Sequence, residues 1–197
     1  KKMLSYDESL KILKETEAFL EGHFILSSGL HSKQYIQCAK LLSHPKQAQI
    51  ICNSLCEKIS KKFNKIDIIL SPALGGVIVG YEVGRQLNIE TIFAERINGK
   101  LLLRRGFKIK ENSNVLVVED VITTGKSALE CLDIVTASSA NLIGYACLID
   151  RSNDDNKIKD KIISQMKIII ETFSEDKLPL DLKKISPIKP GSRNLSK

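Results

Sequence analysis

The fold of this 197-residue chain is decided by one stretch, Val115-Leu116-Val117-Val118-Glu119-Asp120-Val121-Ile122-Thr123-Thr124-Gly125-Lys126-Ser127. Its first four residues are apolar, and three of them are Val, which predicts a strand that is buried on both faces. Two adjacent carboxylates, Glu119 and Asp120, follow where such a strand would end. A short polar turn then leads into a helix that we expect from Ala128 to Val135.

The turn between this strand and this helix is suited to bind an anion. The free N–H groups of the first helical turn point toward such a ligand, and the helix dipole favours negative charge there. Thr123, Thr124 and Ser127 add hydroxyl donors, and Gly125 lets the backbone approach a phosphate closely. The two acids beside this anion site need a partner of their own, which is either a sugar diol or a metal ion.

Two simpler interpretations of the same stretch explain less of it. Gly125-Lys126-Ser127 looks like the end of a Walker A loop, but that motif requires a glycine where this chain has Asp120. An ordinary strand, turn and capped helix would explain the hydroxyl residues but not the paired acids.

Composition indicates a single domain that binds an anionic ligand. The hydrophobic content of 43% supports a sizeable core, and because aromatic residues make up only 5% that core has to be mostly Ile, Leu and Val. A net charge of +7 suits a protein that binds phosphates. It would also suit nucleic acid, but the sequence shows no basic stripe with interleaved aromatic residues, which is the pattern that predicts nucleic-acid binding. The five cysteines are irregularly spaced, and we find no apolar run of transmembrane length and no signal-peptide pattern. We therefore expect buried free thiols, no membrane partner and a cytoplasmic location.

Strand patterns that alternate with helix patterns predict an α/β fold with a mostly parallel sheet flanked by helices. Ser5 and Glu8 form a capping box at the start of an N-terminal helix, and Asn98-Gly99 is a strong hairpin signal. An amphipathic helix is expected at residues 45–59, an apolar helix at 77–87, and further strands at 66–70, 90–94, 141–151 and 167–171.

A second anion site is expected after the strand at residues 66–70. Ser71-Pro72-Ala73-Leu74-Gly75-Gly76 follows that strand and opens onto the apolar helix. This is again a strand, a glycine-containing turn and a helix N-terminus.

The first stretch resembles the signature of the type I phosphoribosyltransferases, which bind 5-phosphoribosyl 1-diphosphate (PRPP). In that family the two acids hold the ribose hydroxyls and the Thr-Thr-Gly-x-Ser turn holds the 5′-phosphate, while the turn after the earlier strand contacts the pyrophosphate. The resemblance implies the type I fold, with a core at residues 58–170 and a small hood made of residues 1–57 and 171–197. It also implies PRPP binding by the residues Glu119, Asp120, Val121, Ile122, Thr123, Thr124, Gly125, Lys126, Ser127, Ala73 and Gly75.

Within that family, the segment from Phe24 to Ser32 and the pair Asp150-Arg151 are similar to the orotate phosphoribosyltransferases. This resemblance spans almost the entire chain. It implies transfer of the phosphoribosyl group from PRPP to orotate in pyrimidine biosynthesis, with orotate held by Thr123 and Arg151. Some members carry Lys where this chain has Ser27, which removes one charge near the ligand. We expect a structural role for His31 in preference to a substrate contact.

The segment after the strand at 90–94 is a mobile loop in the resembled family and supplies cations to the pyrophosphate. Arg96 and Lys100 are our candidates for catalytic cations, whereas Arg104 and Arg105 fit exposed strand positions equally well. The resemblance also implies Mg²⁺ that is bound through PRPP with no firm protein ligand, and a homodimer whose loop reaches the partner's site. Two alternatives stay open: a phosphoribosyltransferase that acts on a purine base, and a regulator that senses PRPP and binds nucleic acid.

Overall fold

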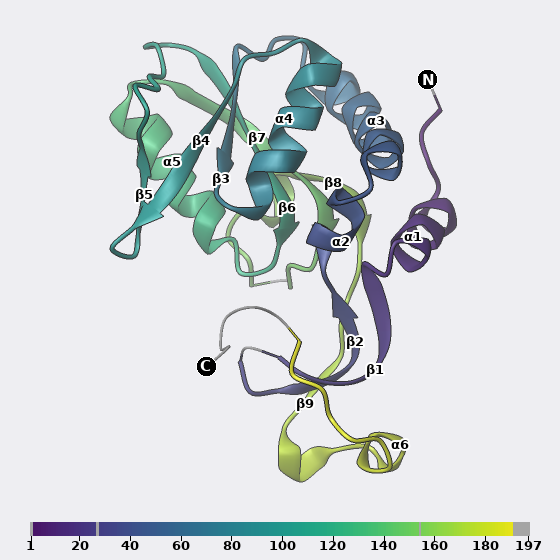
Figure 1. The fold of residues 1–197 in the computed structure, drawn as a ribbon. Helices are drawn as coiled ribbons and strands as arrows, with labels where there is room; N and C mark the ends of the chain where they lie inside the picture. Colours follow the sequence, from purple (N-terminus) through teal and green to yellow (C-terminus); the bar gives the residue numbers. More distant parts are fainter. Residues whose placement is uncertain (1, 27, 154, 191–197) are drawn as a thin grey trace.

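A computed structural model gives the fold of residues 2–26, 28–153 and 155–190, and the description below covers these residues. They form a six-stranded sheet in the order β5-β4-β3-β6-β7-β8 and a three-stranded sheet in the order β1-β2-β9 (Figure 1). The strands are β1 (Phe19–Ile25), β2 (His31–Ile36), β3 (Ile68–Pro72), β4 (Thr91–Ile97), β5 (Lys100–Leu103), β6 (Asn114–Ile122), β7 (Asn141–Asp150), β8 (Ile162–Lys167) and β9 (Thr172–Phe173). In the large sheet every pair is parallel except β4–β5, so the prediction of a mostly parallel sheet is confirmed.

Helices cover both faces of the large sheet. They are α1 (Tyr6–Glu15), α2 (Cys38–Leu42), α3 (Pro45–Lys62), α4 (Gly75–Leu87), α5 (Lys126–Ala137) and α6 (Leu180–Lys183), with 3-10 helices η1 (Lys159–Lys161) and η2 (Glu175–Lys177). One hydrophobic cluster packs α3 and α4 against alternate residues of β6 such as Leu116 and Val118. A second cluster packs α5 against the other residues of that strand, Val115 and Val117. The strand is therefore buried on both faces, as its apolar run predicts.

The predicted helix signals are confirmed. At the start of α1 the Ser5 hydroxyl accepts a hydrogen bond from the Glu8 N–H at 3.2 Å, and the Glu8 carboxylate accepts one from the Ser5 N–H at 2.8 Å. In α3 the residues predicted for the apolar face are all buried: Ala48, Ile51, Cys52, Leu55 and Ile59. All five cysteines of the chain are free and buried, again as predicted.

The hairpin between β4 and β5 is also confirmed, and it lengthens the preceding strand. Asn98 and Gly99 have φ angles of 48° and 82°, which are the left-handed values that a two-residue type I′ turn needs. Because this turn pairs Ile97 with Lys100, β4 continues to Ile97 rather than ending near residue 94.

The predicted strand at residues 167–171 is wrong. The last strand of the large sheet is β8, which ends at Lys167, and Ile168 makes one further hydrogen bond through its N–H to the carbonyl of Asp150 at 2.9 Å. The chain then leaves the sheet, and Ile169 is 82% exposed. The apolar run at 168–170 belongs to the crossing between the two sheets, whereas the actual strand contains the polar residues Ser164 and Gln165.

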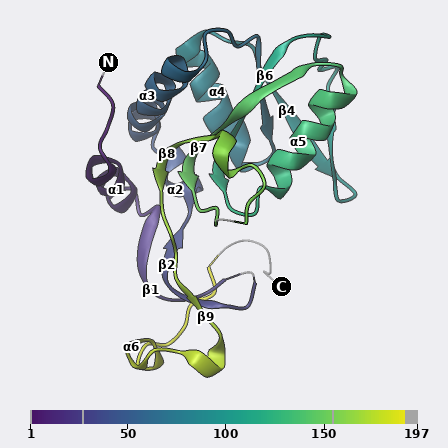
Figure 2. The same cartoon turned by 180° about the vertical axis from the view of Figure 1, so that it is seen from behind.

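The small sheet joins the two ends of the chain. β2 pairs with β1 and β9, and Ile188 forms a bridge with Phe24, so the C-terminal segment packs beside the N-terminal hairpin (Figure 2). His31 is buried, and its Nδ1 lies 2.7 Å from Nε2 of His23, whose Nδ1 lies 2.7 Å from the Ile185 carbonyl oxygen.

The predicted hood boundary at residues 57 and 58 falls inside α3, which is one continuous helix that packs on the large sheet. Ser27, where some relatives have Lys, lies outside the described residues.

Candidate active site

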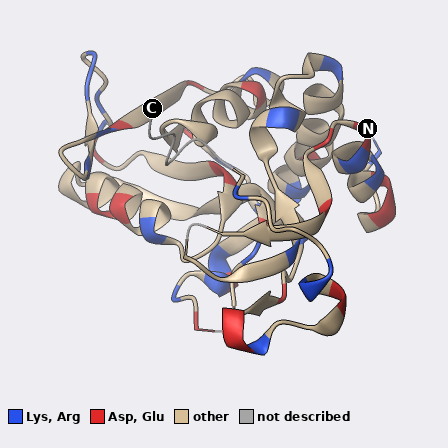
Figure 3. Ribbon diagram, turned by 60° about the horizontal axis from the view of Figure 1, so that its bottom comes forward, with Lys and Arg blue, Asp and Glu red and all other residues tan. Residues whose placement is uncertain are grey.

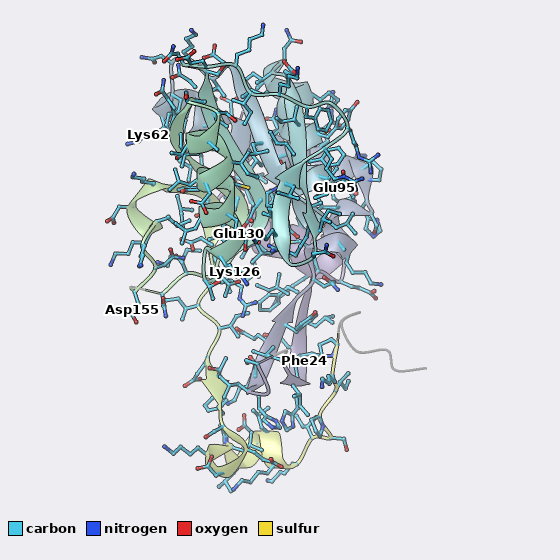
Figure 4. The ribbon with its side chains drawn as sticks, turned by 90° about the vertical axis from the view of Figure 1, so that its left-hand side faces the viewer. Phe24, Lys62, Glu95, Lys126, Glu130 and Asp155 are labelled. Atoms are coloured by element: carbon cyan, nitrogen blue, oxygen red, sulfur yellow. The ribbon has the colours of Figure 1, made fainter. Side chains whose placement is uncertain are left out.

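The carboxyl ends of β3, β6 and β7 meet at the edge of the large sheet that faces the small sheet. These strands are parallel neighbours, so the segments that follow them come together there. The Arg151 N–H, just after β7, donates to the carbonyl of Ile122 at the end of β6 at 2.8 Å. In Figure 4, Lys126 at the start of α5 and Asp155 in the loop after β7 both lie at the end of the large sheet that faces the small sheet. The structure thus places the predicted turns and Arg151 at one edge.

The two predicted acids lie within β6, which runs on to Ile122 instead of ending before them. Because side chains alternate along a strand, they point to opposite faces of the sheet. Asp120 points to the α4 side, where its carboxylate abuts the α-carbon of Gly75. Glu119 points to the α5 side, close enough to Cys131 and Arg96 for their charges to interact. The strand therefore carries one carboxylate to each of two neighbouring turns.

Burial weakens the acidity of both carboxyl groups. The pKa of Glu119 is raised from 4.5 to about 8, first by burial and then by the charge of Asp120, while Arg96 opposes the shift. Burial also raises the pKa of Asp120, and hydrogen bonds from the backbone N–H groups of Val121 and Asp120 itself oppose it. Adjacent carboxyl groups with raised pKa values of this kind cluster at functional sites.

Replacing Glu119 with Gln is expected to stabilise the fold at alkaline pH. Since the pKa of Glu119 is about 8 in the folded protein, its favourable contribution is present below 4.5 and is lost as the pH rises through 8. Glutamine cannot ionise, so Glu119→Gln should gain roughly a few kcal/mol over the native chain at alkaline pH. The gain should shrink toward acidic pH.

Thermal unfolding followed across this pH range measures that effect. Glu111→Gln is the matched control because Glu111 is exposed, and we expect its unfolding to follow that of the native chain. Equal stability of Glu119→Gln and the native chain at alkaline pH would contradict the burial of an ionised carboxylate.

The polar turn after β6 presents its two threonines to solvent. Thr123 and Thr124 are exposed, and the Thr124 hydroxyl accepts a hydrogen bond from the Lys126 N–H at 3.3 Å. Gly125 has a φ of 74°, a left-handed conformation that glycine adopts without strain. Val121 and Ile122, which the family resemblance also places at the ligand, pack their side chains into the core. Any contact they make with a ligand has to come from the backbone.

The candidate cations on the β4–β5 hairpin are only partly free. Arg96 donates through Nη1 to the Glu130 carboxylate at 2.9 Å and to the Gly99 carbonyl at 2.6 Å. Arg105 donates to the Glu95 carboxylate through two hydrogen bonds of 2.9 Å. The remaining two cations, Lys100 and Arg104, are exposed and have no salt-bridge partner among the residues that the structure describes. Arg96 and Arg105 would have to leave their carboxylates to meet a pyrophosphate.

Arg151 has an unused donor at the edge where the turns meet. Its Nε is buried and has no hydrogen-bond partner in the described part of the chain. Burial lowers the pKa of this guanidinium, while the nearby groups Tyr35 and Cys38 oppose the shift. Tyr35 belongs to β2 of the small sheet, so this site uses both sheets. A planar cation with an unused buried donor suits a carboxylate ligand.

The contacts of Tyr35 and Gly75 were not apparent from the sequence pattern alone. Tyr35 follows the segment from Phe24 to Ser32 that resembles the orotate enzymes, but nothing in that part of the sequence placed it near Arg151. Gly75 was a candidate for the pyrophosphate turn, yet only the structure shows that Asp120 occupies the space a side chain would need.

Residues 2–26, 28–153 and 155–190 contain no group of three or more His, Cys, Asp or Glu side chains that would hold a metal ion.

Comparison with known proteins identifies relatives of the chain. A family model described as the phosphoribosyl transferase domain matches residues 39–178. The chain is 45% identical over 190 residues to an orotate phosphoribosyltransferase of Caldicellulosiruptor bescii, a match that covers 96% of this chain and 99% of the relative. An orotate phosphoribosyltransferase of Chlorobium phaeobacteroides is 44% identical over 187 residues, with 95% and 96% of the two chains covered.

Solved structures share the fold. The crystal structure of orotate phosphoribosyltransferase from Aeropyrum pernix superposes with a TM-score of 0.70 and 23% identity, covering 80% of this chain and 92% of that one. An adenine phosphoribosyltransferase from Thermoanaerobacter pseudethanolicus superposes with a TM-score of 0.58 and 15% identity, covering 68% and 88%. The predicted type I fold class is confirmed by these matches, and the fold is common to enzymes named for different bases.

Proposed function

The chain belongs to the orotate phosphoribosyltransferases of the phosphoribosyltransferase family, and from this premise we propose that it transfers the phosphoribosyl group of PRPP to orotate. The products are orotidine 5′-phosphate and pyrophosphate, and the reaction is a step of pyrimidine biosynthesis. The observation that carries the proposal is the pair of buried Glu119 and half-buried Asp120, set between two glycine-containing turns with the unused donor of Arg151 at the same edge. The full-length similarity to orotate phosphoribosyltransferases supports it.

PRPP fits this edge with each of its charged parts next to a complementary group. The turn at residues 123–127 offers N–H and hydroxyl donors to the 5′-phosphate, and the turn at 73–75 offers the start of α4 to the pyrophosphate. Glu119 and Asp120 accept hydrogen bonds from the ribose hydroxyls. Arg151 forms paired hydrogen bonds with the orotate carboxylate, and Thr123 adds a hydroxyl contact to the base.

The reaction breaks the bond between C1 of the ribose and the pyrophosphate oxygen, which keeps the electron pair. Orotate reacts in the form that has already lost its N1 proton to solvent, and N1 supplies the electron pair of the new bond to C1. As the bond breaks, the sugar gains positive charge, which favours ionisation of the acids on β6, and their ionised form stabilises that charge electrostatically. Lys100 and Arg96 are the proposed cations for the departing pyrophosphate, and closure of the β4–β5 hairpin excludes water.

We propose Mg²⁺ as the accompanying ion. The described residues offer no cluster of three ligands, and the two acids of β6 point to opposite faces, so the chain alone does not form a metal cage. Oxygens of PRPP therefore have to supply most of the ligands. When bound there, the ion screens the charge of the pyrophosphate.

A single assay tests the proposed reaction. The absorbance of orotate is followed with PRPP and Mg²⁺ present, and adenine and hypoxanthine replace orotate as controls. We expect consumption of orotate alone. Turnover of a purine without turnover of orotate would favour the purine-base alternative, which the shared fold of adenine phosphoribosyltransferases keeps in view.

The alternative of a nucleic-acid-binding regulator has less support. Basic and acidic positions are distributed over most elements, without a basic face in the view of Figure 3. Nucleic-acid binding would depend strongly on salt, so a filter-binding assay at low and high salt distinguishes this alternative. Tight, salt-sensitive binding would count against the enzyme proposal.

No helix in the described ranges is long and apolar enough to cross a membrane. The free buried cysteines suit the reducing cytoplasm, which we propose as the location.

We further propose a homodimer that forms through α4. Leu74, Ile78 and Tyr81 are 84%, 53% and 66% exposed, and their spacing of four and three places them on one face of this helix. An exposed apolar surface of this kind marks an interface. A second copy of the chain is the occupant that the family resemblance implies.

Replacing Ile78 with Asp is expected to convert the dimer to a monomer, because the carboxylate would be buried unpaired in the interface. Light scattering after size-exclusion chromatography measures the mass. Leu180→Asp is the matched control, since Leu180 is 78% exposed on α6. A native chain that elutes as a monomer at micromolar concentration, or a dimer that tolerates Ile78→Asp, would contradict this interface.

A further inference from the structure

The turn that precedes α5 is held by a residue from another loop. Gly125 is the N-cap of α5, and as a glycine it has no side chain that could cap the helix. The carbonyl of Thr123 accepts a hydrogen bond of 3.0 Å from Nδ2 of Asn156, which lies in the segment between β7 and η1. A residue 33 positions away thus bonds directly to the turn.

The amide of Asn156 is oriented by two partners that each allow only one role. Its Nδ2 donates to the Thr123 carbonyl, which can only accept. Its Oδ1 accepts from the Ile158 N–H at 3.0 Å, which can only donate. Asn156 is 7% exposed, so water does not readily replace either bond.

Asn156 also packs against the turn. A Cβ added to Gly125 would lie 3.1 Å from Oδ1 and 3.2 Å from Nδ2 of Asn156. The amide therefore fills the space behind the glycine, while Thr123 and Thr124 remain exposed on the turn. In Figure 4, the neighbouring residue Asp155 lies at the same end of the sheet as Lys126, which follows the turn.

We propose that Asn156 is a positioning residue for the phosphate-binding turn of this enzyme. It fixes the direction of the Thr123 carbonyl and the approach of Gly125, and so aims the N–H and hydroxyl groups of the turn at the 5′-phosphate. This inference rests on the proposed function, and it extends that function by assigning a role to the loop after β7. It predicts an effect on the phosphate end of PRPP and none on the pyrophosphate end, which the separate turn at residues 73–75 serves.

The test measures binding of ribose 5-phosphate and of inorganic pyrophosphate as separate probes, together with kcat and KM for PRPP. Asn156→Leu removes both hydrogen bonds at similar volume. Asn156→Ser keeps a side-chain acceptor for the Ile158 N–H but is too short to reach Thr123, so it maintains the loop if the leucine variant fails to fold. Asn153→Ser is the matched control, because Asn153 is exposed in the same loop.

We expect both Asn156 variants to raise the Kd for ribose 5-phosphate and the KM for PRPP by roughly tenfold to a hundredfold. The Kd for pyrophosphate should stay within about twofold of the native value, and kcat should fall less than KM rises. Binding of ribose 5-phosphate by Asn156→Ser as tight as by Asn153→Ser would overturn the inference and leave the proposed function standing. Failure of the native chain to bind ribose 5-phosphate or to consume orotate would overturn both.

Discussion

Replacing Arg151 with Ala is expected to lower kcat/KM for orotate by roughly a thousandfold, since charge-assisted hydrogen bonds to a carboxylate are worth several kcal/mol at a partly buried site. Among the described residues, the buried Nε of this guanidinium has no hydrogen-bond partner, so the site meets the carboxylate with a donor whose desolvation is largely complete. The Kd for PRPP should change only a few-fold, because we propose that PRPP binds at the turns after β3 and β6. Steady-state kinetics with orotate and a binding titration with PRPP measure the two quantities.

Two variants separate the recognition of orotate from a general effect of charge. Arg151→Lys keeps the positive charge but loses the planar pair of donors, so we expect it to recover only a small part of the activity. Lys46→Ala removes an exposed cation on α3, and it should behave as the native enzyme does. Unchanged kinetics with orotate in Arg151→Ala would exclude Arg151 as the residue that binds the orotate carboxylate.

Much of the site was predictable because its signals are local. The apolar run before Glu119, the hydroxyl turn and Gly125 are neighbours in sequence, and strand alternation fixes the direction of the side chains within the run. The Asn98-Gly99 turn likewise needs only two residues with positive φ. Local chemistry of this kind leaves few alternatives for the backbone.

The parts that were not predictable depend on contacts between distant residues. Glu130 accepts a hydrogen bond from Arg96, which lies 34 positions away, and the sequence around either residue does not predict this ion pair. The run at residues 168–170 is apolar enough for a strand, yet tertiary structure assigns it to the crossing between sheets. An arginine that forms a salt bridge with a nearby carboxylate is not free to bind the pyrophosphate in this conformation. A sequence pattern does not show which arginines form such salt bridges.

Replacing Gly75 with Ala is expected to lower kcat/KM for PRPP by roughly a hundredfold, because a displacement of about 1 Å at a reacting site costs that much. An added Cβ would lie 2.7 Å from both Cγ and Oδ1 of Asp120, closer than atoms in contact allow. Gly75 does not adopt a left-handed conformation, so the backbone itself accepts alanine. The Asp120 carboxylate has to move instead, away from the position in which we propose that it binds the ribose hydroxyls. Steady-state kinetics with varied PRPP measures the loss.

A double-mutant cycle shows whether the loss passes through Asp120. Asp120→Ala removes the carboxylate and leaves room for the new methyl group, so adding Gly75→Ala to it should cost little more. Gly22→Ala is the matched control for a glycine in regular structure, since its Cβ would approach only the movable Phe24 ring, at 3.3 Å. If the two losses in free energy add, Gly75 acts on its own through the backbone of the pyrophosphate turn. If they do not add, the Asp120 carboxylate on β6 and the N-terminus of α4 act as one unit. The absence of a side chain at Gly75 is then what lets these two groups lie next to each other.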